Sequence, residues 1–290
     1  MFDRLIRIAS NNKTPLLLGM MAVNFLLTGV DVLIAHSQNN FFRWELIPLI
    51  YTPLAVLAIL ALLAFKANPL VRRAFQFVMG LGVLVGVLGT VFHLLGNATF
   101  SRETLHHLLV EGSPVAAPIA FAGISCYALA SEKYRGTARY SSLLLLVGLG
   151  FLGSVAAAFL DHARLAFIPG YTLIPLVTGS LAAVTCFYLA YYQEADSAAR
   201  TIFLWIMLLN LVVGVLGCGF HLLGNLAGTR SIVWARMMYR NPLLGPLLFS
   251  NLALLGGLSL LPEKNLGHED SLEEKTTLAG LADGLSQLQR

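Results

Sequence analysis

The feature of this chain that most limits its fold is a series of eight apolar segments. They cover approximately residues 15–35, 46–65, 76–97, 114–131, 141–161, 172–192, 202–225 and 243–261. Each segment approaches the ~20 apolar residues that a helix needs to cross the hydrocarbon core of a bilayer. Only 12% of the residues are charged, whereas soluble domains have about a quarter. The sequence therefore predicts an all-α polytopic membrane protein with eight transmembrane helices.

A duplicated motif divides the eight segments into two sets of four. Gly86–Asn97 recurs as Gly214–Asn225, with ten of twelve positions identical at an offset of 128 residues. Prolines recur with it: Pro48, Pro114 and Pro118 correspond to Pro175, Pro242 and Pro246. We therefore expect two tandem four-helix repeats, at 1–135 and 136–261, followed by a polar cytoplasmic tail at 262–290. Because four is an even number, both repeats have the same topology, and a pseudo-two-fold axis is expected along the membrane normal.

The distribution of Lys and Arg predicts the orientation of the chain. With a cytoplasmic N-terminus, the inner segments carry thirteen of these residues and the outer loops carry six. An excess of Lys and Arg marks the cytoplasmic side, so both termini are expected inside, in a bacterial cytoplasmic membrane. The last outer loop is an exception, because it contains Arg230, Arg236 and Arg240.

Four histidines lie near the outer ends of the odd-numbered segments, at one expected depth. They are His36, His93, His162 and His221. Ionisable residues inside membrane helices are costly and usually mark functional sites. Small residues share the histidine face at helical spacing, among them Gly86, Gly89, Gly214 and Gly217. Such residues either allow close helix packing or leave a flat slot for a planar macrocycle beside its axial ligand.

This arrangement is typical of b-type haem sites, in which histidines from facing helices ligate the iron. The sequence predicts two b haems on the outer side, each held by two of the four histidines. Asn97 and Asn225, four residues after the motif histidines, are candidates to fix a ring tautomer or to bond a haem edge. Arg102 and Arg230, in the outer loops, are candidates to bind the propionates. Pairing within repeats and pairing between repeats both satisfy the duplication.

These features predict a di-haem b-type cytochrome, acting as a subunit of an oxidoreductase complex rather than as a stand-alone enzyme. It would pass electrons between an outer-face redox protein or dehydrogenase subunit and quinone in the lipid bilayer, with no nucleic-acid partner. One alternative is a permease in which the four histidines bind copper, zinc or iron ions at its outer mouth. The scarcity of ionisable side chains deeper in the segments disfavours an ion path. A structural anchor with incidental histidines is the third interpretation.

Overall fold

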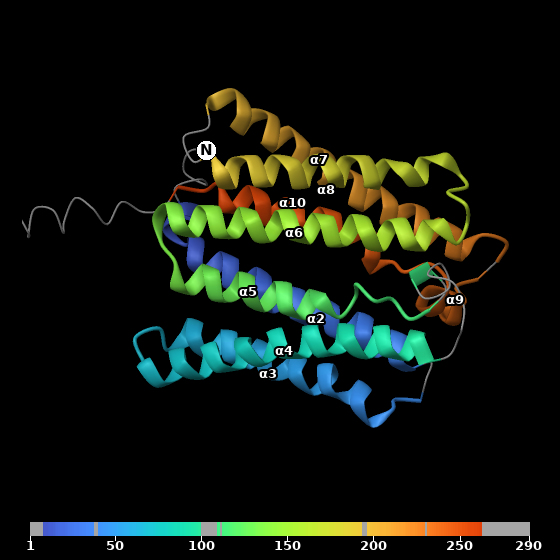
Figure 1. Ribbon diagram of the computed structural model, residues 1–290, viewed down its shortest axis with the longest axis horizontal. Coiled ribbons are helices and arrows are strands. Elements are labelled where there is room, and N and C mark those ends of the chain that lie inside the picture. The colour runs from blue at the N-terminus through green and yellow to red at the C-terminus, as the bar shows by residue number, and fades with distance from the viewer. Residues whose placement is uncertain are drawn as a thin grey trace, which may run out of the picture. The chain divides into compact units, whose positions relative to one another are not determined.

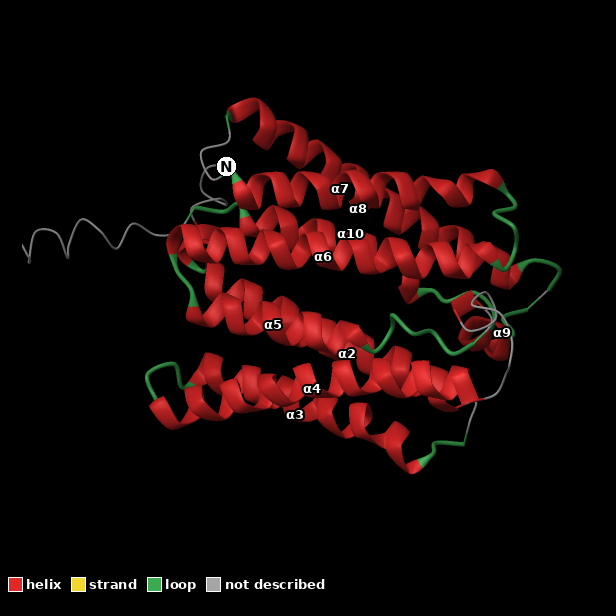
Figure 2. Ribbon diagram, in the orientation of Figure 1, coloured by secondary structure: helices red, strands yellow, loops and turns green. Residues whose placement is uncertain are grey.

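The computed structural model describes residues 8–37, 40–99, 109–110, 112–192, 196–229 and 231–262, without the side chains of residues 97–99 and 239. Within these ranges the regular secondary structure consists of helices (Figure 2). In chain order the elements are α2 (Lys13–Ser37), η1 (Arg43–Glu45), α3 (Leu46–Ala64), α4 (Pro69–Thr99), α5 (Ile119–Lys133), α6 (Gly136–Ala163), η3 (Gly170–Leu173), α7 (Ile174–Tyr191), α8 (Ser197–Leu226), α9 (Trp234–Tyr239) and α10 (Leu244–Ser259).

Six helical segments are long and apolar enough to cross a membrane. They are Lys13–Ser37, Arg43–Ala64, Pro69–Gly96, Gly136–Ala163, Gly170–Tyr191 and Ser197–Leu226. The other two predicted spans fall on α5 and α10, which have 15 and 16 residues and are therefore shorter than a full span. Each of the eight apolar segments thus overlaps one helix, and six of these helices have the length expected of a transmembrane helix.

The long helices turn large apolar side chains outward. Leu57 on α3 is 63% exposed, Val184 on α7 is 63% exposed and Trp205 on α8 is 66% exposed. Only 22–39% of the residues in the most apolar windows of the six long helices are buried inside the protein. Water-soluble proteins rarely expose contiguous apolar surface of this kind. The helices satisfy their own backbone groups, as a bilayer requires, so the exposure indicates an integral membrane protein.

Contacts divide the chain into two units. One is Thr14–Leu260, which holds the helices described here apart from the first residue of α2 (Figure 1). The other joins Met1–Lys13 to Leu261–Arg290, and in it the Lys13 ammonium donates to the Leu261 carbonyl oxygen at 2.7 Å. The expected repeat boundary at residues 135 and 136 falls inside the first unit, between α5 and α6. The division into repeats stays a prediction.

Aromatic side chains join the helices of each half of the larger unit. Phe25 on α2 lies 5.7 Å from Tyr51 on α3 and 6.3 Å from Phe121 on α5, measured between ring centroids. In the second half, Phe151 on α6 and Phe249 on α10 also lie 6.3 Å apart. Edge-to-face and tilted aromatic pairs at these distances add to the packing energy of buried rings.

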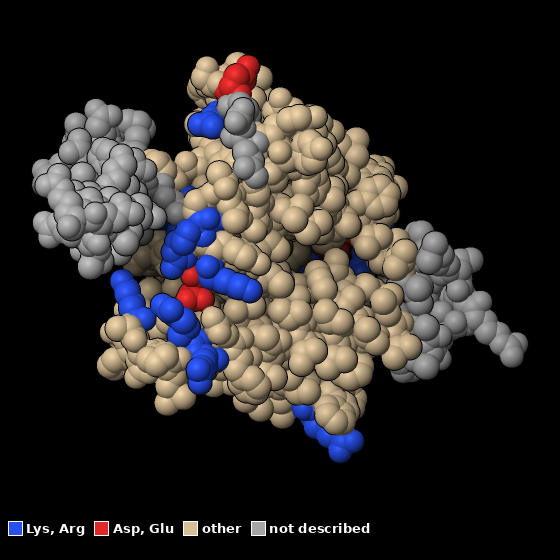
Figure 3. Space-filling model, turned by 60° about the vertical axis from the view of Figure 1, so that its left-hand side comes forward, with Lys and Arg blue, Asp and Glu red and all other residues tan. Residues whose placement is uncertain are grey.

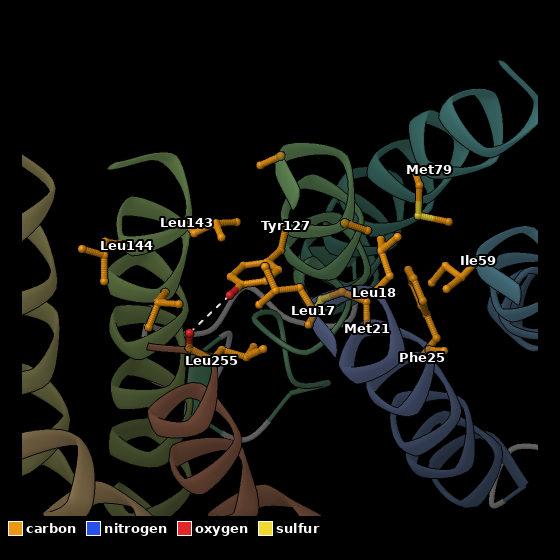
Figure 4. Packing of buried hydrophobic residues seen from close by; sticks show 14 of the residues in the cluster. Leu17, Leu18, Met21, Phe25, Ile59, Met79, Tyr127, Leu143, Leu144 and Leu255 are labelled. Atoms are coloured by element: carbon orange, nitrogen blue, oxygen red, sulfur yellow. Dashed lines mark hydrogen bonds between the residues drawn. The ribbon is translucent and has the colours of Figure 1, made fainter. Parts of the chain in front are cut away.

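Helix α10 carries polar contacts to the first half. The side-chain amides of Asn24 on α2 and Asn251 on α10 bond each other in both directions, at 3.2 and 2.6 Å. The Tyr127 hydroxyl on α5 donates to the Leu255 carbonyl oxygen at 3.3 Å and lies 3.1 Å from the Ser259 hydroxyl (Figure 4). Apolar faces of membrane helices gain little by leaving lipid, so interhelical hydrogen bonds such as these help to hold the helices together.

Two helix pairs approach each other closely at glycines. A Cβ atom added to Gly86 on α4 would lie 2.6 Å from the Ala122 backbone nitrogen of α5. A Cβ atom added to Gly214 on α8 would lie 2.7 Å from the Pro246 carbonyl oxygen of α10. Both distances are shorter than real Cβ contacts, so any side chain at these positions forces the helices apart.

We expect Gly214→Ala to lower the free energy of unfolding by about 1–3 kcal/mol, the usual cost of overpacking. Gly219→Ala on the same helix is the matched control, because a Cβ atom there meets nothing within 4 Å. Unfolding in mixed micelles titrated with dodecyl sulfate measures both variants. Equal stability of the two would show that the close approach of α8 and α10 does not limit their packing.

Candidate functional site

The structure brings the first two candidate histidines together. His36 lies one residue before the end of α2, and His93 lies in the last two turns of α4. Their ring centroids are 6.4 Å apart, with an angle of 43° between the ring planes. Both side chains are half-buried. The two rings are therefore near enough to act on one ligand.

The other two candidates form a second pair of nearly the same dimensions. His162 at the end of α6 and His221 near the end of α8 have ring centroids 6.5 Å apart, with an angle of 86° between their planes. Both are again half-buried. Each pair joins histidines from one half of the chain, and which histidines share a ligand stays a prediction.

A backbone carbonyl orients each motif histidine. The Nδ1 atom of His93 lies 3.0 Å from the Pro114 carbonyl oxygen, and the Nδ1 atom of His221 lies 2.7 Å from the Pro242 carbonyl oxygen. A carbonyl oxygen only accepts hydrogen bonds, so Nδ1 carries the proton in both rings. In the neutral imidazole this tautomer leaves the lone pair on Nε2, the usual arrangement of a metal-ligating histidine. His36 shows a longer contact of the same type, from Nδ1 to the Glu45 carbonyl oxygen at 3.4 Å.

Asn225 binds the backbone of the residue before Pro242, whose carbonyl oxygen meets His221. The Asn225 side chain is only 1% exposed. Its Nδ2 atom donates to the Asn241 carbonyl oxygen at 3.0 Å, and its Oδ1 atom accepts from the Asn241 backbone nitrogen at 3.0 Å and from the Asn241 side chain at 2.9 Å. Because Asn241 directly precedes Pro242, Asn225 fixes the backbone next to the residue whose carbonyl oxygen meets His221.

The four candidate glycines lie where neighbouring helices pack. Gly86 and Gly214 contact α5 and α10 as described above. A Cβ atom on Gly89 or Gly217 would lie 2.8 Å from the Cβ atom of Pro118 or Pro246. Of the two roles that the sequence leaves open for small residues beneath a histidine, the structure shows close helix packing. Participation of these glycines in a cofactor site stays a prediction.

Three other candidate positions lie outside the described part of the chain: the side chain of Asn97, and Arg102 and Arg230. Their expected roles are therefore untested.

Three further arginines make defined contacts. Arg236 and Arg240 donate to the carbonyl oxygens of Ala227 and Gly224, at 2.8 and 3.1 Å, and so cap the end of α8. Arg164 donates to the carbonyl oxygens of Val110 and Gly112. Basic side chains favour helix C-termini, where carbonyls lack partners. The two contacts at the end of α8 give Arg236 and Arg240 a structural role.

Each pair brings two imidazole rings together. Within the described ranges, no group of three or more His, Cys, Asp or Glu side chains is placed to hold a metal ion.

We expect Asn225→Ala to destabilise the protein by about 1–3 kcal/mol, because it leaves the half-buried Asn241 backbone groups without their partner. Thr201→Ala is the control, since it removes an exposed hydrogen bond within the same helix and should change stability by less than about 0.5 kcal/mol. Thermal unfolding in detergent measures both. An Asn225→Ala variant as stable as the control would mean that Asn225 does not hold this segment.

Comparison of the chain with protein-family models, with curated proteins and with solved structures finds no match. The function is therefore inferred from the two histidine pairs and their surroundings.

Proposed function

We propose that this protein is a membrane di-haem b-type cytochrome subunit that passes electrons between an outer-face redox partner and quinone. The observation that carries the proposal is the spacing within each histidine pair. A metal ion about 2 Å from the nitrogen of each of two imidazoles, on the line between them, separates the ring centroids by about 6 Å. The observed 6.4 and 6.5 Å would therefore leave room for a metal ion between the two imidazoles of each pair.

The chemistry of the donor set fits a haem. Bis-histidine ligation takes two imidazoles from facing helices, and the macrocycle provides the other four nitrogen ligands. His36 and His93 would hold one haem, and His162 and His221 the other. When bound in this way, haem supplies reversible one-electron exchange. The Pro114 and Pro242 carbonyls support the assignment, because a hydrogen bond at Nδ1 holds the ring orientation and raises the basicity of Nε2.

We also infer that the two halves are tandem four-helix repeats, with α5 and α10 as the fourth membrane helix of each. Contacts between corresponding residues support this. Phe121 and Phe249 are 128 residues apart, and Phe25 and Phe151 are 126 apart, which is the spacing of His36 and His162. The pairs Phe25 with Phe121 and Phe151 with Phe249 have the same centroid distance. The bond from His93 to Pro114 corresponds to the bond from His221 to Pro242. Tyr127 and Leu255 are equivalent residues, and their contact is expected beside a pseudo-two-fold axis along the membrane normal.

The orientation proposed for the chain is N-terminus and C-terminus inside, in a bacterial cytoplasmic membrane. Basic residues gather at the helix ends away from the histidines, among them Lys66 after α3, Arg72 at the start of α4 and Lys133 at the end of α5. This distribution follows the positive-inside rule and leaves the histidine pairs on the outer side. A redox protein or dehydrogenase subunit would then dock on the outer face, and quinone would exchange electrons from within the bilayer.

Double variants test the proposal together with the pairing. The purified protein should contain about two haems by pyridine haemochrome. His36→Ala combined with His93→Ala should leave one haem with a native reduced spectrum, because both residues serve the same site. His36→Ala combined with His221→Ala should remove both haems. Two single variants, His93→Ala and His221→Ala, should each lose one.

Several outcomes would contradict the proposal. A folded, colourless protein without iron would end the haem assignment. Copper or zinc in its place would favour the metal-ion permease instead. Loss of both haems from the first double variant, with retention of one haem in the second, would show that ligands are shared between the halves.

A further inference from the structure

A cavity of about 240 Å³ opens at the end of the helices opposite the histidines. It lies between the start of α2, the end of α3, the start of α4 and the end of α5. Three basic residues, Lys66, Arg72 and Arg135, line it together with one acidic residue, Glu132. Figure 3 shows Lys and Arg side chains gathered around acidic atoms on this part of the surface. None of these residues belongs to the histidine site.

The charges of the cavity do not cancel. Glu132 is nearly buried, and its carboxylate accepts from Arg72 Nε at 3.0 Å and from Gln76 Nε2 at 3.4 Å. The lining has one carboxylate and three cations, so it carries an excess of two positive charges. Lys66 and Arg135 are exposed, and Arg135 also donates to the neutral carbonyl oxygens of Glu132 and Tyr134, which do not cancel its charge. A group of opposite charge is therefore the favoured occupant.

Apart from Thr14, the rest of the lining is apolar. Leu18 on α2 and Leu62 and Leu63 on α3 contribute to the wall. Leu18 and Leu62 are nearly inaccessible, whereas Leu63 is half-buried and supplies accessible apolar surface. A free inorganic anion gains nothing from such a wall. A ligand with a charged group beside an apolar segment satisfies both parts of the cavity, which is the composition of a phospholipid at the junction of headgroup and acyl chains.

We propose that this cavity binds an anionic phospholipid, with the phosphate among Lys66, Arg72 and Arg135 and the start of the acyl chains against the leucines. Basic pockets between membrane helices on the cytoplasmic side are suited to such headgroups. The volume fits a phosphate with its glycerol but is below that of sites that enclose a whole small molecule. The acyl chains therefore continue into the bilayer beside α3 and α4.

The test is binding of a short-chain phosphatidylglycerol to the delipidated full-length protein in neutral detergent, measured by native mass spectrometry. Phosphatidylcholine of the same chain length should bind more weakly. Lys66→Gln and Arg135→Gln should each weaken phosphatidylglycerol binding about fivefold, the usual contribution of one basic residue near an anionic lipid. Arg200→Gln is the matched control, because Arg200 is exposed and does not line the cavity.

Three results would overturn the proposal. The first is equal binding of the two lipids. The second is equal binding of phosphatidylglycerol by the cavity variants and Arg200→Gln, all with unchanged size-exclusion profiles. The third is displacement of the lipid by inorganic phosphate at the same concentration, which would mean that the leucine wall adds nothing. None of these readouts depends on the histidines, so the outcome is separate from that of the haem experiment.

Discussion

The close approach of α4 to α5, and of α8 to α10, is the constraint on which the histidine site depends. Gly89 and Gly217 leave room for Pro118 and Pro246, which a Cβ atom would meet at 2.8 Å. The residue four positions before each of these prolines is Pro114 or Pro242, and its carbonyl oxygen reaches the histidine. A bilayer supplies little hydrophobic force between helices, so this packing has to come from the fit of small residues. Larger residues in place of Gly89 and Gly217 would push Pro118 and Pro246 away. The Pro114 and Pro242 carbonyl oxygens would then move out of reach of the histidines.

The two halves fill one corresponding space in different ways. In the first half, the Tyr51 hydroxyl and Ser125 occupy the position that a side chain at residue 82 would need, and that residue is Gly82. The second half has Asn210 in place of Gly82, at the offset of 128 residues, and Thr178 in place of Tyr51, at the offset of 127 that relates Pro48 to Pro175. The Asn210 amide donates to the Thr178 carbonyl oxygen at 3.0 Å. A large and a small residue have exchanged places, which keeps the interior filled as close packing requires.

The length of the apolar segments was sufficient to place the helices, but the contacts between side chains could not be predicted in the same way. The segment predicted at 46–65 coincides with α3 at Leu46–Ala64, whereas the one predicted at 76–97 misses the polar first turns of α4. The four histidines were identifiable because an imidazole is rare in an apolar run. Their pairing was not, since a symmetric duplication permits two solutions. The role of the Pro114 and Pro242 carbonyls could not be predicted from the sequence either. Every residue has a carbonyl, and only the fold shows which one meets a histidine ring.

The length of α4 relates the two ends of the protein. Arg72 and His93 are 21 residues apart on this helix, which corresponds to about 30 Å at 1.5 Å per residue. That distance equals the thickness of the hydrocarbon core. If Arg72 meets headgroups on one side, His93 therefore lies at the opposite edge of the core and not at its centre. Both histidine pairs occupy helix ends of this kind. A ligand held by either pair would therefore lie at one edge of the bilayer and not at its centre, and the proposed electron transfer would run along the membrane.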